Sequence, residues 1–150
     1  MKGRLHVVGG PNLGRLGRRE PEIYGTTTWA ELADRCRAWA AELGYECVWD
    51  QADGEGELVG MIHAASDDGA GLILNAAAYT HTSVAVRDAV AACAVPVVEV
   101  HLSQYPAREP FRRVNLLADV VRASLSGFGV EGYRLALQGL AELLAADVES

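Results

Sequence analysis

Short, continuously apolar runs alternate with longer amphipathic stretches along the whole chain, and this alternation constrains the fold more than any other feature. The apolar runs are four to five residues long and lie near glycine or proline, which is typical of buried strands. They predict strands at residues 5–8, 46–49, 71–74, 96–100 and about 121–125. The stretches with helical periodicity predict helices at residues 28–43, 56–65, 83–92 and 133–145.

The helix predicted at residues 28–43 has the clearest boundary signals. Thr28 precedes the apolar periodicity and Glu31 follows three residues later, a pair that caps the N-terminus of a helix. Apolar residues then recur on one face until Gly44, a residue type that commonly ends helices.

Regular alternation of strands and helices favours the α/β class. Strands that are apolar throughout, rather than at every second residue, indicate a parallel sheet with helices on both faces. Five strands then favour the flavodoxin-like order 2-1-3-4-5, in which ligands bind at the carboxyl ends of strands one, three and four. At this length we expect a single domain spanning residues 1–150.

Polar residues gather where the third and fourth predicted strands end. Asn75 and His81 follow the third strand, while Glu99, His101 and Ser103 accompany the fourth. Glu99 and His101 are two residues apart on a strand, so their side chains lie on the same face and can touch. We therefore expect both histidines to face one crevice.

Positive charge is concentrated in two segments although the chain has a net charge of −7. The acidic balance disfavours nucleic acid as a partner, because a phosphate backbone requires a surplus of basic residues. Six of the thirteen Lys and Arg residues nevertheless lie in two short stretches: Arg15, Arg18, Arg19, Arg108, Arg112 and Arg113. This pattern favours a small anionic ligand, and the long segment 9–27 is predicted to act as a lid that carries Arg18, Arg19 and Tyr24.

Several other classes of protein lack support in this sequence. There is no glycine-rich dinucleotide or P-loop motif, and no spacing of Cys or His that predicts a metal site. Cys36, Cys47 and Cys93 are scattered in apolar patterns and are interpreted as reduced thiols. The first apolar run is too short for a signal peptide or a membrane span, so we expect a cytoplasmic protein without membrane contact.

Five blocks of sequence together resemble the type II 3-dehydroquinate dehydratases. They are GPNLGRLGRREPEIYG (10–25), EGELVGMIHAA (55–65), LNAAAYTHTSVAVRDA (74–89), PVVEVHLSQYPAREPFR (96–112) and GFGVEGYRLAL (127–137). The resemblance implies a flavodoxin-like subunit that dehydrates 3-dehydroquinate to 3-dehydroshikimate through an enolate. It also implies catalysis without metal, cofactor or Schiff base.

The resemblance assigns the catalytic roles to a few positions. Tyr24 is the base with Arg19 nearby, Asn12 orders a water that stabilises the enolate, and His101 is the general acid whose ring Glu99 orients. The energies are compatible with a tyrosine base: ionising a phenol of ordinary pKa about 10 at pH 7 costs about 4 kcal/mol. One guanidinium at about 4 Å returns a similar amount at an effective dielectric of about 20.

The same resemblance implies the substrate contacts. Asn75 and His81 bond ring hydroxyls, and Arg112 offers a forked donor. The turn formed by Leu102 and Ser103 presents backbone N–H groups to the substrate carboxylate. Asp88 reaches the site of a neighbouring subunit, in a homo-oligomer that is a dodecamer built from trimers.

The chain departs from the family pattern in four places. Gly9 stands where the family usually has Asn, Gln51-Ala52-Asp53 replaces Gln-Ser-Asn, Gln104 replaces Asn, and the segment 114–118 replaces a stretch that contains His-Ser. None removes a named catalytic group, but all alter residues that support loops.

Three hypotheses therefore stay open: a 3-dehydroquinate dehydratase, a lyase of the same mechanism for a modified cyclohexanone carboxylate, and a catalytically silent ligand-binding subunit of the same fold. A biosynthetic and a catabolic role are equally compatible with the sequence.

Overall fold

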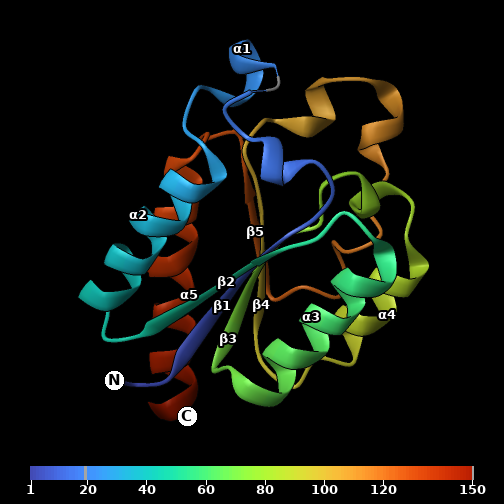
Figure 1. Cartoon of the computed structure of the whole chain (residues 1–150). Helices are drawn as coiled ribbons and strands as arrows, with labels where there is room; N and C mark the ends of the chain where they lie inside the picture. Colours follow the sequence, from blue (N-terminus) through green and yellow to red (C-terminus); the bar gives the residue numbers. More distant parts are fainter. Residues whose placement is uncertain (19, 150) are drawn as a thin grey trace.

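A five-stranded parallel sheet forms the centre of the molecule (Figure 1). The computed structural model describes residues 1–18 and 20–149, with Tyr24 and Glu149 described by their backbone alone. The strands are β1 (Arg4–Gly9), β2 (Glu46–Gln51), β3 (Gly71–Asn75), β4 (Val97–His101) and β5 (Ala123–Ser126). Their order is β2-β1-β3-β4-β5 and every pairing is parallel. The flavodoxin-like order predicted from the alternation is confirmed.

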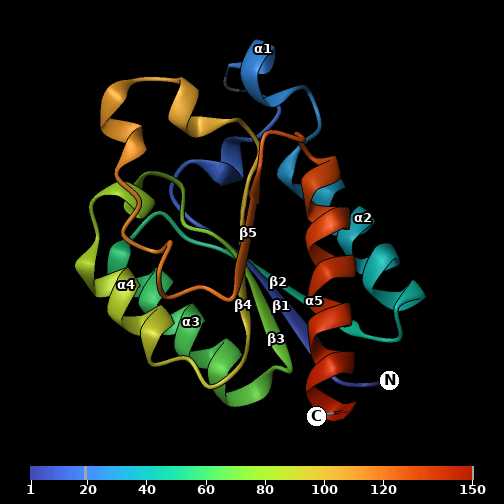
Figure 2. The ribbon, with the colours of Figure 1, turned by 180° about the vertical axis from the view of Figure 1, so that it is seen from behind.

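Helices cover both faces of the sheet (Figures 1 and 2). One face carries α2 (Trp29–Glu42) and α5 (Glu131–Glu149), and the other carries α3 (Glu55–Asp68) and α4 (Val84–Ala91). A short helix, α1 (Pro21–Tyr24), lies beyond the carboxyl end of the sheet. Within the described residues, no helix is both long and apolar enough to span a membrane.

Side-chain caps fix the starts of two of these helices. The hydroxyl of Thr28 accepts a hydrogen bond from the backbone N–H of Glu31 at 3.1 Å, as the sequence predicts for α2. Ser83 caps α4 in the same way, accepting from the N–H of Val86 at 2.9 Å. Gly44 follows α2 with a φ of 90°, a conformation that favours glycine.

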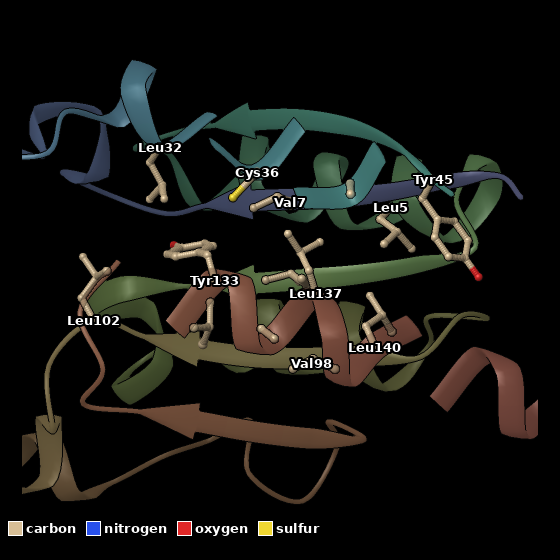
Figure 3. Packing of buried hydrophobic residues seen from close by; sticks show 14 of the residues in the cluster. Leu5, Val7, Leu32, Cys36, Tyr45, Val98, Leu102, Tyr133, Leu137 and Leu140 are labelled. Carbon is tan, nitrogen blue, oxygen red and sulfur yellow. The ribbon is translucent and has the colours of Figure 1, made fainter. Parts of the chain in front are cut away.

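Two apolar cores lie on opposite faces of the sheet, because alternate residues of each strand point to opposite sides. Leu5 and Val7 pack with Tyr133 and Leu137 on the side of α2 and α5 (Figure 3). Leu72 packs against α3 and α4 on the other side. Since both faces are buried, the strands need apolar residues at successive positions, which explains the continuous runs in the sequence.

The three cysteines are free thiols. Cys36 is completely buried in the core beside α5, and burial raises the pKa of its thiol strongly. Burial also raises the pKa of Cys47 to about 11. Both thiols are therefore protonated at neutral pH and poor nucleophiles, in agreement with their interpretation as reduced packing residues.

Two segments differ from the expected boundaries. Strand β5 begins at Ala123 rather than near residue 121, because the N–H groups of Val120 and Val121 bond the carbonyl of Leu117 in a turn. The segment 9–27 is not a loop throughout, since it contains a 3₁₀ helix, Leu13–Arg15, and the helix α1. Leu13 and Leu16 are buried in the core. Its first half is thus fastened to the body of the protein.

Gly9, the last residue of β1, lies against an aromatic ring. A Cβ at this position would come within 2.4 Å of the indole of Trp29. That indole packs in turn on Trp49, with ring centroids 4.1 Å apart. The tryptophans therefore act as packing residues beside the end of β1.

Candidate active site

A pocket of about 170 Å³ lies at the carboxyl ends of β1, β3 and β4, the edge expected from the strand order. Its walls come from the segments that follow these three strands. They are Pro11, Asn12, Leu13, Asn75, Ala77, Ala78, His81, His101, Leu102, Ser103, Tyr105, Arg108 and Arg112.

The end of β4 supplies a buried acid–imidazole pair. Nε2 of His101 lies 2.7 Å from a carboxylate oxygen of Glu99, which is completely buried. Since an ionised carboxylate can only accept hydrogen bonds, the hydrogen of this contact lies on Nε2. The other ring nitrogen, Nδ1, is not bonded to Glu99. The amide nitrogen of Asn115 lies 3.2 and 3.1 Å from the two oxygens of the same carboxylate. The contact between Glu99 and His101, which their two-residue spacing on the strand allows, is therefore present.

A hydrogen bond to the segment just after Arg112 and Arg113 holds the ring of His81. Its Nδ1 donates to the carbonyl oxygen of Val114 at 2.7 Å, so Nε2 of the neutral ring is an acceptor. The ring of Tyr105 lies beside both histidines, 4.4 Å from His101 and 5.6 Å from His81 between centroids. Both imidazoles thus belong to one aromatic cluster at the pocket wall.

Asn75, at the end of β3, is buried and bonded through both ends of its amide. Its oxygen accepts from the N–H of Ala77 at 3.1 Å and its nitrogen donates to the hydroxyl of Tyr133 at 3.4 Å. Ala77 has a φ of 52°, which is strained for a residue with a side chain. Burial raises the pKa of Tyr133, so its hydroxyl stays protonated. Asn75 therefore has a fixed orientation in the pocket wall.

Asn12, after β1, is held by the loop that follows β2. Its backbone N–H donates to a carboxylate oxygen of Asp53 at 2.9 Å, and Asn12 adopts a left-handed φ of 70°. The amide of Gln51 donates to the same oxygen at 2.9 Å and to the carbonyl of Gly10 at 3.1 Å. The bond from Asn12, followed by that from Gln51, lowers the pKa of Asp53.

Two arginines bring positive charge to the pocket. The guanidinium of Arg108 lies 3.6 Å from the carboxylate of Glu20, linking the loop after β4 to the segment 9–27. Arg112 donates its Nε–H to Glu109. Both arginine side chains are mostly buried. Of the six clustered arginines, Arg108 and Arg112 therefore line this pocket.

Seven of the predicted site residues line the pocket: Asn12, Asn75, His81, His101, Leu102, Ser103 and Arg112. Glu99 lies behind His101. Asp88 is exposed on α4 and is not among the residues that line this pocket. Arg19 and the side chain of Tyr24 lie outside the described residues.

The sequence-based prediction did not include Tyr105, Asp53 or Asn115 among the site residues. The sequence marked Asp53 and Asn115 in one respect, because both stand where the family pattern has another residue. Arg108 was recognised as part of the basic cluster, with an ion pair to Glu109 as one interpretation, but its contact with Glu20 was not predicted. Among the described residues, no group of three or more His, Cys, Asp or Glu side chains is arranged to hold a metal ion.

Comparisons with known proteins agree with this geometry. A family model described as dehydroquinase class II matches residues 3–141. A 3-dehydroquinate dehydratase of Salinispora arenicola is 54% identical over 138 residues, covering 92% of this chain and 96% of that protein. The crystal structure of type II dehydroquinase from Propionibacterium acnes superposes with a TM-score of 0.91 at 44% identity, over 95% of this chain and 98% of that one. The structure from Butyrivibrio crossotus gives a TM-score of 0.89 at 33% identity, over 92% of this chain and 97% of that one. The chain therefore belongs to the class II dehydroquinase family.

Proposed function

We propose that this chain is a 3-dehydroquinate dehydratase, a hydro-lyase that converts 3-dehydroquinate to 3-dehydroshikimate through an enolate, and that residues 1–150 act as one domain. The observation that carries the proposal is the pocket at the carboxyl ends of β1, β3 and β4, where His101 faces the same space as two arginines and is bonded to the buried carboxylate of Glu99. This pocket occurs in a chain that is 54% identical to an enzyme of that name.

The reaction requires three groups. A base removes the proton alpha to the ketone, a donor stabilises the enolate oxygen, and an acid protonates the beta hydroxyl, which leaves as water. His101 is the proposed acid. Because its Nε2 is bonded to Glu99, we assign the transferred proton to Nδ1. The carboxylate of Glu99 stabilises the protonated ring before the transfer and fixes its orientation.

Tyr24 is the proposed base and Arg19 the group that stabilises its phenolate. Both assignments follow from the match to the family block at residues 10–25. Asn12 orders the water that supports the enolate. The hydrogen bond from its backbone to Asp53 supports this role, because it fixes the residue at the pocket mouth.

The remaining pocket residues fit a ligand with ring hydroxyls and a carboxylate. Nε2 of His81 accepts from one hydroxyl, and the second amide hydrogen of Asn75 donates to another. The terminal amino groups of Arg112 and the backbone of Leu102 and Ser103 attract the anionic end of the substrate.

We further propose a homo-oligomer, a dodecamer built from trimers, in which Asp88 enters the site of a neighbour. Asp88 is exposed on α4, and Val84, one turn earlier on that helix, is also exposed. Asp88 also lies in the sequence block 74–89 that resembles the family, and the resemblance implies that this position serves a neighbouring site.

Mixing the purified protein with 3-dehydroquinate tests the function. Formation of the conjugated enone should raise the ultraviolet absorbance, with turnover that saturates in substrate concentration. A His101→Ala variant serves as the control for a contaminating enzyme. No increase in absorbance above the background of that variant would rule the activity out.

A further inference from the structure

We infer that Asn115 is a positioning residue for the reaction, which holds the carboxylate of Glu99 and through it the ring of His101. This inference rests on the proposed function, since it concerns the same acid. Asn115 lies in the segment 114–118 that departs from the family pattern, so its role belongs to this chain's own version of the site.

The orientation of the Asn115 amide follows from its neighbours. Its oxygen accepts from the backbone N–H of Leu117 at 2.7 Å, and a backbone N–H can only donate. The amide nitrogen must then face the opposite way, where it lies 3.2 and 3.1 Å from the two oxygens of Glu99. Asn115 is therefore a donor to this carboxylate.

Glu99 depends on that donor because it is completely buried. A buried carboxylate requires hydrogen bonds to remain ionised and in place. In the described part of the chain, the hydrogen bonds to its oxygens come from His101 and Asn115. Without Asn115, the carboxylate would be free to rotate, and this change would release the His101 ring.

Asn115 also contacts a second neighbour of the imidazole. Its amide nitrogen lies 2.8 Å from the hydroxyl oxygen of Tyr105, whose ring packs against His101 with centroids 4.4 Å apart. One amide thus connects the carboxylate that bonds His101 Nε2 and the aromatic ring that packs against the imidazole. The histidine is confined in both orientation and position.

Asn115→Asp is the sharpest variant. It is nearly isosteric and keeps an oxygen for the N–H of Leu117, so the loop retains its anchor. It replaces the donor with a second carboxylate that repels Glu99. Displacement of the acid should lower kcat by about 10- to 100-fold at pH 8, with KM changed much less. Two adjacent carboxylates retain a proton between them as the pH falls, and this proton restores a donor.

The deficit of Asn115→Asp relative to wild type should therefore shrink between pH 8 and pH 6. Asn115→Ala also loses the donor but adds no titratable group, so its deficit should stay constant over the same range. Gln104→Glu is the matched control: it adds the same charge on the same loop, and its acid oxygen can still accept from the hydroxyl of Ser126. Its kcat should stay within about twofold of wild type.

A second measurement does not need turnover. Nitrogen-15 shifts of the neutral His101 ring report its tautomer, which should be the Nε2–H form in wild type and a mixture in Asn115→Ala. If wild type is inactive but the tautomer changes in the variant, the proposed function fails and the positioning role stands. If wild type is active and Asn115→Asp keeps its kcat within about twofold from pH 6 to pH 8, the positioning role is wrong.

Discussion

The backbone N–H of Asn12 and the carboxylate of Asp53 are 2.9 Å apart, so the loop after β1 is fastened to the loop after β2 at the mouth of the pocket. The accepting oxygen also takes a hydrogen bond from Gln51. Neither bond needs a charge on residue 53; both need an oxygen acceptor there.

This relationship predicts opposite outcomes for two substitutions of Asp53. Asp53→Asn keeps an oxygen that accepts from Asn12, and its kcat should stay within about threefold of wild type. Asp53→Ala removes the acceptor and should lower kcat by about tenfold or more, because Asn12 is no longer held in its left-handed conformation. Steady-state kinetics of both variants would check this. Equal kcat values for the two would show that the contact does not serve catalysis.

The stability of the fold at acid pH should depend on Asp68. Hydrogen bonds from His6, at 2.9 Å, and from Arg4 lower the pKa of this carboxyl in the folded protein. Because the folded pKa lies below the unfolded value of about 3.9, the stabilisation is fully present above about pH 4 and is lost as the pH falls through the folded pKa.

Asp68→Asn should accordingly lower the melting temperature at pH 7, and the difference from wild type should vanish at the acid end of the range. Asp34→Asn is the control, because Asp34 pairs with Arg37 on the exposed surface of α2. Melting curves at several pH values would decide, and a constant difference for Asp68→Asn down to pH 2 would contradict the linkage.

Tyr24 and Arg19 should differ in how their loss responds to pH. Tyr24→Phe deletes the base and should lower kcat by about 100-fold or more while substrate affinity changes little. Arg19→Ala leaves the phenol near an ordinary pKa of about 10, so part of its lost rate should return as the pH is raised. Arg19→Lys should be intermediate. Near-normal kcat in Tyr24→Phe would exclude the phenolate as base.

Activity should survive both EDTA and borohydride added with substrate. The sequence contains one lysine, Lys2, whose amino group lies 5.9 Å from the ring centre of Tyr45. Lys2 precedes β1, while the pocket is at the carboxyl end of that strand. A Schiff base at the site therefore has no amine to form from. Inactivation by borohydride, or by EDTA, would overturn the enolate mechanism.

Light scattering should give a mass well above that of one 16.0 kDa chain at micromolar concentration. In a mixture with inactive Tyr24→Phe subunits, Asp88→Ala subunits should regain activity, because a Tyr24→Phe neighbour still supplies Asp88 to their sites. A monomeric mass, or mixtures no more active than the separate variants, would contradict the shared site.

Much of the fold was predictable because it depends on local patterns. The apolar runs identified the strands, and Thr28 with Glu31 identified the start of α2. The contact of Glu99 with His101 was predictable for the same reason, since strand geometry relates residues two apart. Strand β5 was placed less well, because the turn at Leu117 captures the valines before it.

The contacts that hold the site residues in place were not predictable from local patterns. Asn115 reaches Glu99 although the two are 16 residues apart and lie in different segments, so no periodicity relates them. Tyr105 lies in a short 3₁₀ helix, Tyr105–Ala107, whose position depends on the whole loop after β4. Such contacts are set by tertiary packing, and the sequence indicated Asn115 only through the departure of the segment 114–118 from the family pattern.

The contact between Gly9 and Trp29 links one of those departures to the packing beside the end of β1. The indole already fills the volume that a side chain at position 9 would need, so there is no free space beside this glycine. An asparagine at position 9 would have to displace the indole of Trp29. The two positions are therefore coupled: a larger residue at position 9 should be accommodated only together with a smaller one at position 29.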